Sequence, residues 1–171
     1  MMRARSWLRE RAPGYADLPP GDKEEITRFF WLWSFFEGTF ARGEGDIRKT
    51  DALVGRWAAA KALDENDFAA SLDYFADRYF PGGVESEHYE KLAVLVRHGA
   101  RVDGRVRAVL TRENRDLVEI VRVLFIIVYR LRNNLVHGGK WAYQLSGQRS
   151  NFRHANRFLM RAMEIDGRGL L

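Results

Sequence analysis

The most apolar stretch of the chain, VLFIIVY at residues 123–129, lies next to the strongly polar sequence RLRNNLVHGGK at residues 130–140. The apolar stretch is typical of a buried core helix, and it is far shorter than the roughly 20 residues that a membrane-spanning helix needs. A helix terminus needs only a glycine and one cation, but here arginine, asparagine and histidine occur together. These polar residues form either a helix cap or a functional site.

Composition indicates one globular domain. The chain has 171 residues, of which 46% are hydrophobic and 13% aromatic, and it contains no cysteine. That excludes disulfides and thiolate metal sites. The start of the chain lacks the apolar segment of a secretory signal, so we expect a soluble, cytoplasmic protein with no membrane partner. The net charge of +5 comes mainly from arginine, which favours nucleic acid as a partner only slightly.

The periodicity of apolar residues predicts an all-α fold, because no alternating strand pattern occurs. Residues 1–21 read as an N-terminal arm and residues 22–171 as one helical domain. Asp22 is expected to cap the first helix, with Glu25 completing a capping box, and Asn114 is expected to cap the long helix. The expected helices span residues 22–42, 46–63, 66–80, 85–98, 115–137 and 150–165, with a short helical connector at 103–111.

The spacing of the polar residues leaves the choice between cap and site open. Asn133 and His137 are four residues apart and share a helix face, whereas Arg132 lies roughly 140° from His137 in an ideal helix. Arginine and histidine converge only if the last turn loosens or a second copy of the helix lies alongside. Each residue taken singly also fits a C-terminal cap that complements the helix dipole.

The sequence RNNLVH resembles the R-x4-6-H motif of the HEPN superfamily, with Arg132 and His137 as the motif residues. As in that family, the motif ends an apolar penultimate helix and is followed by a final helix. The early sequence FFWLWSFFEGTF resembles the first HEPN helix, in which Glu37 would face the site. The resemblance covers about residues 22–166, and only the motif and its helix are specific.

This resemblance implies an up-and-down helical bundle with extra helices, which forms a two-fold homodimer. In such a dimer both Arg–His pairs line one cleft. Many members of the family are metal-independent endoribonucleases of toxin–antitoxin or phage-defence systems, so RNA and an antitoxin or regulatory protein are the expected partners. In toxins regulated by nucleotidyltransferase antitoxins a tyrosine follows the histidine by two residues. Gly139 stands there in this chain, which puts that partner system in doubt.

The residue types suit RNA cleavage by the substrate's own 2′-hydroxyl. In this interpretation His137 transfers protons, Arg132 stabilises the phosphorane oxygens, and Asn133 orients His137 or bonds a phosphate. Glu37 falls beside aromatic residues on the helical wheel, where an ordinary ion pair with Arg132 fits as well as a catalytic role.

We expect no cofactor and no metal. No acidic residue occurs between Glu119 and Glu164, so the motif region cannot build an oxygen-rich magnesium site by itself. The remaining histidines share no metal-ligand spacing and are interpreted as surface or capping residues; they are His88, His98 and His154.

The candidate RNA-binding residues are basic or aromatic and follow the motif. Lys140 and Tyr143 come directly after it, and a basic ridge recurs every four residues on the last helix at Arg153, Arg157 and Arg161. The ridge fits an ordinary solvated face or RNA backbone contact. Two other functions remain open. One is a non-catalytic HEPN module that binds a nucleotide or protein, and the other is a basic helical protein that binds nucleic acid through its last helix.

Overall fold

The computed structural model describes residues 4–40, 47–137 and 145–167. Within these ranges every regular element is a helix, so the all-α prediction is confirmed for the described chain. The elements are α1 (Ala4–Arg11), α2 (Pro20–Thr39), α3 (Ile47–Ala59), α4 (Glu65–Tyr79), the short 3-10 turn η1 (Pro81–Gly83), α5 (Glu87–Leu92), α6 (Val94–His98), α7 (Ala100–Leu110), α8 (Leu117–His137) and α9 (Arg149–Gly167).

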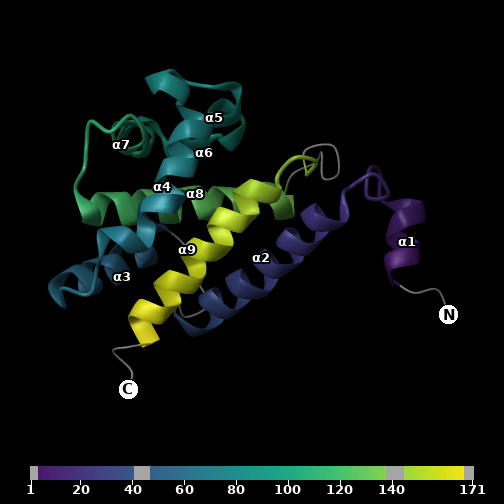
Figure 1. Ribbon diagram of the computed structural model, residues 1–171, viewed down its shortest axis with the longest axis horizontal. Coiled ribbons are helices and arrows are strands. Elements are labelled where there is room, and N and C mark those ends of the chain that lie inside the picture. The colour runs from purple at the N-terminus through teal and green to yellow at the C-terminus, as the bar shows by residue number, and fades with distance from the viewer. Residues whose placement is uncertain (1–3, 41–46, 138–144, 168–171) are drawn as a thin grey trace.

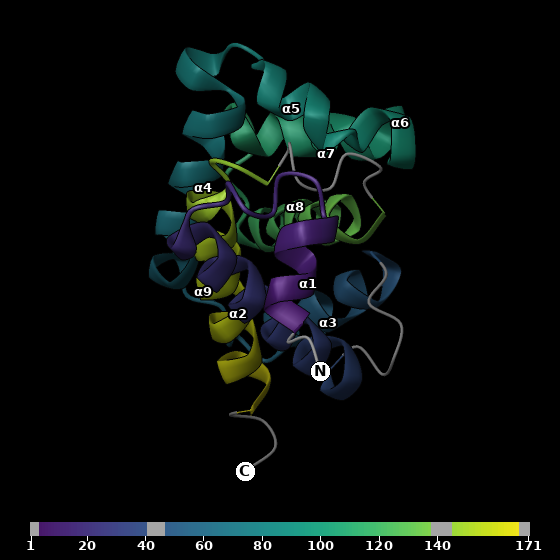
Figure 2. The same cartoon turned by 90° about the vertical axis from the view of Figure 1, so that its right-hand side faces the viewer.

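Helix α8 runs through the middle of the molecule, with α5, α6 and α7 on one side and α2 and α9 on the other (Figures 1 and 2). Residues 123–128 are buried without exception. A helix that is apolar on every side is stable only when it is surrounded by protein. The apolar stretch recognised in the sequence is therefore the central element of the fold.

The ring of Phe125 joins α8 to helices on three sides. Its centroid lies 5.4 Å from that of Phe36 on α2, 6.0 Å from that of Trp57 on α3 and 4.7 Å from that of Phe158 on α9. Offset and edge-to-face pairs at these separations add to the stabilisation that burial provides. These ring contacts hold α2, α3 and α9 in position around α8.

Helices α2 and α9 lie side by side (Figures 1 and 2), with their N-terminal ends at the same end of the pair. Asp22 Oδ2 accepts a hydrogen bond of 3.0 Å from the backbone N–H of Gly147, and Glu25 Oε2 accepts one of 3.0 Å from Asn156 Nδ2. The predicted capping box at Asp22 and Glu25 was therefore wrong. The helix begins at Pro20, since proline is favoured at the first helical position, and both carboxylates are buried in tertiary contacts.

Three other expectations differ from the structure. Residues 85–98 form two helices, because Ala93 adopts a left-handed backbone conformation with a φ of 57° and interrupts the pattern. The expected short connector at 103–111 is instead part of a longer helix, α7, which begins at Ala100 and ends at Leu110. Part of the expected N-terminal arm is helical, as α1, although none of its residues is buried.

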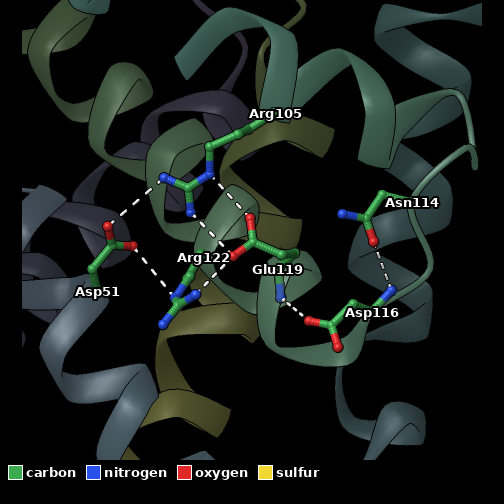
Figure 3. A network of polar contacts seen from close by, with 6 residues as sticks. All are labelled: Asp51, Arg105, Asn114, Asp116, Glu119 and Arg122. Atoms are coloured by element: carbon green, nitrogen blue, oxygen red, sulfur yellow. Dashed lines mark hydrogen bonds and ion pairs between the residues drawn. The ribbon is translucent and has the colours of Figure 1, made fainter. Parts of the chain in front are cut away.

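The start of α8 is fixed by two successive side-chain caps (Figure 3). Asn114 Oδ1 accepts the backbone N–H of Asp116, and Asp116 Oδ1 accepts that of Glu119, both at 2.9 Å. The residue next to the helix is thus Asp116, and Asn114 caps the turn before it. Aspartate in this position satisfies a free N–H group and complements the helix dipole.

Glu119 also anchors a charged network that links α3, α7 and α8 (Figure 3). Its carboxylate accepts hydrogen bonds of 3.0 Å from Arg105 Nε and 2.7 Å from Arg122 Nη1, and Asp51 lies within 3.8 Å of both guanidinium groups. Burial raises the pKa of Glu119, but the hydrogen bonds from Arg122 and Arg105 outweigh it and leave the pKa below its ordinary value. This network fixes the end of α8 that is remote from the motif.

Candidate functional site

Arg132 lies near the C-terminal end of α8 and faces α2. Its Nη2 atom is 3.9 Å from Oε2 of Glu37, and its Nη1 donates a 3.0 Å hydrogen bond to Oδ1 of Asn133. Trp33 Nε1 donates to the same Oε2 atom of Glu37 at 3.2 Å. The structure therefore brings together Arg132, Asn133 and Glu37, three of the four residues that the sequence analysis identified as catalytic candidates.

The geometry of this cluster leaves Arg132 able to bind an anion. The side chains of Arg132 and Glu37 are 27% and 29% exposed. An ion pair at 3.9 Å between partly exposed groups contributes about 0–1 kcal/mol, so this pair alone holds Arg132 only weakly. The planar guanidinium has further N–H donors for phosphate oxygens. The cluster thus offers a partly exposed guanidinium beside a carboxylate that is also bonded to Trp33.

The other residues of the predicted motif site fall outside what the structure describes. His137 is the last residue of α8, and its side chain lies outside the described part of the chain. Lys140 and Tyr143 belong to residues 138–144, which also lie outside it. The roles expected for these three residues stay predictions.

The basic ridge on α9 is partly neutralised by carboxylates. Arg161 forms ion pairs with Asp67 on α4 and with Glu164. Arg153 is 55% exposed and lies 4.0 Å from Glu25, whereas Arg157 is exposed and forms no ion pair with any described residue. Arg153 and Arg157 therefore remain exposed, whereas the guanidinium of Arg161 is held by two carboxylates.

Asn134 and Arg130 form a second polar group on α8 that the sequence analysis did not identify. Arg130 is only 4% exposed, and it donates hydrogen bonds to the backbone oxygen of Leu92 at 2.9 Å and to Oδ1 of Asn134 at 2.8 Å. Burial, reinforced by the charge of Arg97, lowers the pKa of Arg130. Arg130 and Asn134 are four residues apart and share a helix face, but the sequence motif was assigned to Arg132.

The three other histidines differ in their surroundings. His98, at the end of α6, is partly buried, and its ring centroid lies 6.0 Å from that of Tyr129. His88 is exposed on α5, whereas the imidazole of His154 stacks on Tyr74 with ring centroids 4.2 Å apart. His154 is therefore a packing residue of the α4–α9 contact, and Nδ1 is buried with no hydrogen-bond partner among the described atoms. Burial, followed by the charges of Arg157 and Arg153, lowers the pKa of His154. No group of three described His, Asp or Glu side chains is placed to hold a metal ion.

Comparisons with known proteins add no family assignment. No protein-family model, curated protein sequence or solved structure matches this chain. Among the helices that the structure describes, none combines the length and the apolar character needed to span a bilayer.

The environment of His154 predicts a stability that depends on pH. The unfolded imidazole has a pKa of about 6.5, and the folded one has a lower pKa. Below pH 6.5 the unfolded state therefore binds more protons, and the free energy of unfolding should fall as the pH drops toward the lowered folded pKa. His154→Gln should reduce the loss of stability between pH 7.5 and pH 5.5, as measured by urea denaturation. His88→Gln, at an exposed site, should reduce it less, and equal slopes in all three proteins would contradict the assignment.

Proposed function

We propose that this protein is a metal-independent endoribonuclease of the HEPN type. It would act as a homodimer in a toxin–antitoxin or phage-defence system, under the control of an antitoxin or regulatory protein. The observation that carries the proposal is the position of Arg132. Its guanidinium is partly exposed, is loosely paired with Glu37 and lies on the helix that ends at His137.

The proposed reaction needs no nucleophile from the protein. The 2′-hydroxyl of the RNA attacks the adjacent phosphorus, so a P–O2′ bond forms and the P–O5′ bond breaks. One His137 accepts the proton of the 2′-hydroxyl, and the His137 of the second protomer gives a proton to the leaving 5′-oxygen. Arg132, oriented through Asn133, stabilises the negative charge that builds on the phosphorane oxygens.

The exposed side of α2 supports the dimer. The apolar residues of α8 between residues 123 and 128 are all buried within one chain, so they are not available to a partner. In contrast, Phe30, Trp31 and Phe35 on α2 are 44%, 74% and 59% exposed. Phe30 precedes Glu37 by seven residues and lies on the same side of the helix. A partner that covers Phe30 would therefore border the cluster of Glu37 and Arg132, whereas Trp31 and Phe35 lie farther round the helix.

The outward side of α2 is also complementary to itself. Two copies of α2 that cross antiparallel about a two-fold axis between Ser34 and Phe35 would place Trp31 against Gly38 and Phe35 against Ser34. Large rings thus meet small residues in both directions, as an isologous interface requires. A Cβ atom at Gly38 would meet nothing within 4 Å, so this position has room for a partner's ring.

This arrangement makes a specific prediction for substitutions in α2. Gly38→Leu should make the protein monomeric, because the new side chain occupies the space of the partner's Trp31, while the helix itself is not weakened, since leucine has a higher helix propensity than glycine. Trp31→Ser should have the same effect by removing the ring. Size-exclusion chromatography with light scattering measures the outcome. Val96→Ser, at an apolar residue that is 82% exposed on α6, is the matched control and should stay dimeric. A monomeric wild type at micromolar concentration would rule out the composite site.

The chemistry predicts the products and the cofactor requirement of purified protein acting on RNA. Cleavage should continue in excess EDTA and should leave 2′,3′-cyclic phosphate and 5′-hydroxyl ends, which mass spectrometry of the fragments identifies. A single 2′-deoxy nucleotide at the scissile position should block cutting there, because the nucleophile is missing.

A double variant separates binding from chemistry in the same assay. The double substitution of Arg153 and Arg157 by alanine should weaken RNA binding and flatten its dependence on salt, and cleavage at saturating RNA should persist.

Loss of cleavage in EDTA that magnesium restores, or efficient cutting of DNA, would contradict the proposed mechanism.

A further inference from the structure

A second candidate site is a cavity of about 330 Å³ that lies between α4, α5, the end of α8 and the start of α9. Arg132 does not line it. Asn134 does, and two residues along an ideal helix are separated by about 160° around the axis. The end of α8 therefore contributes side chains to two sites. Arg132 is directed toward α2, and Asn134 is directed toward the cavity.

The cavity is positively charged. Arg78, His88 and Lys91 line it, and none of its described lining residues is acidic. Lys91 is 62% exposed and is paired with Glu87, an 85% exposed residue of the same helix. Behind the wall, the buried guanidinium of Arg130 bonds to Leu92 and Asn134, which both face the cavity. An anion in this cavity would meet Arg78 and Lys91 and no carboxylate among the described lining residues.

Two further observations bear on the positive charge beside the cavity. The Nε atom of Arg78 is buried and has no hydrogen-bond partner among the described residues, and a buried donor without a partner is costly. The pKa of His88 is lowered by desolvation and by the nearby charges of Arg78 and Lys91. A bound anion would offset the repulsion that a protonated His88 meets from Arg78 and Lys91.

The rest of the cavity suits a flat, partly polar group. Its apolar side is formed by leucine side chains and by Phe152, and such a surface favours the face of a base. Its polar side carries the amides of Asn134, Gln148 and Asn151. The amide Nε2 of Gln148 donates to no described atom, so it is available to the hydrogen-bonding edge of a base.

The polar wall is held in place before any ligand binds. Tyr74 donates a 2.9 Å hydrogen bond to Oδ1 of Asn151, and Nδ2 of Asn151 donates to Oε1 of Gln148. On the other side, Nδ2 of Asn134 donates to the backbone oxygen of Lys91 at 3.2 Å. A wall that is already ordered loses little conformational entropy on binding.

We propose that this cavity binds one phosphorylated nucleoside, with its phosphate at Arg78 and Lys91 and its base between the leucine side chains and Gln148. Its volume is at the small end of the roughly 300–1,000 Å³ of ligand pockets, which suits a single nucleotide. The ligand is either a free nucleotide or one nucleotide of an RNA strand. The site is separate from the proposed cleavage reaction and does not depend on it.

Isothermal titration of the full chain with each nucleoside 5′-monophosphate, its nucleoside and inorganic phosphate tests the proposal. At least one monophosphate should bind at least tenfold more tightly than either its nucleoside or inorganic phosphate. Lys91→Gln, at an exposed position that leaves the fold intact, should weaken that binding at least fivefold, and Arg78→Gln should weaken it more. Arg101→Gln removes the same charge from an exposed position of α7 and should change the affinity less than twofold.

The two sources of the ligand are separated by competition. A non-cleavable 2′-O-methyl tetranucleotide that displaces the monophosphate, and whose own binding is weakened by Lys91→Gln, identifies the site as a position for RNA. A tetranucleotide that fails to displace it identifies a free nucleotide as the ligand. The proposal is overturned if no monophosphate binds at millimolar concentration, if nucleoside or phosphate binds equally well, or if Arg101→Gln matches the effect of Lys91→Gln.

Discussion

The complete burial of the apolar part of α8 is the constraint on which the rest of this structure depends. Each fully buried aliphatic or aromatic side chain contributes roughly 1.5–3 kcal/mol to the stability of the fold. Residues 123–128 are all buried, so this part of α8 has no face exposed to solvent. The ring of Phe125, in contact with rings from α2, α3 and α9, fixes the helix in one register. The polar residues that follow are therefore projected in defined directions, with Arg132 toward α2 and Arg130 toward α5.

A second constraint sets the position of α2. Glu25 is 7% exposed, and its carboxylate contacts Asn156 of α9 as well as Arg28 and Arg153. A buried carboxylate is stable only when such partners compensate its lost hydration. This contact and the bond from Gly147 to Asp22 hold the first half of α2 against α9. The second half then presents Glu37 to Arg132 and leaves aromatic rings on the outside.

The sequence was sufficient for the fold class and for the central helix, because both depend on helical periodicity. The contact of Arg132 with Glu37 was one of two alternatives that followed from the family resemblance, and periodicity alone did not predict it. The sequence was insufficient where the same residue type can serve either as a helix cap or in a tertiary contact. Asp22 and Glu25 matched a local capping pattern, but their carboxylates were needed in tertiary contacts. The left-handed backbone conformation at Ala93 could not be predicted, because no glycine or proline marks that position. The cavity combines residues from Arg78 to Phe152, and only the packing of four helices brings them together.

The central claim is that Arg132 and His137 together cut RNA. The most direct measurement is expression of the wild type, Arg132→Ala, His137→Ala and the intervening exposed variant Val136→Ala in bacteria, with growth and RNA integrity scored in the same cultures. We expect growth arrest with fragmented RNA for the wild type and Val136→Ala, and normal growth with intact RNA for the other two at equal protein levels. Intact RNA with the wild type, or equal fragmentation with His137→Ala, would contradict the claim.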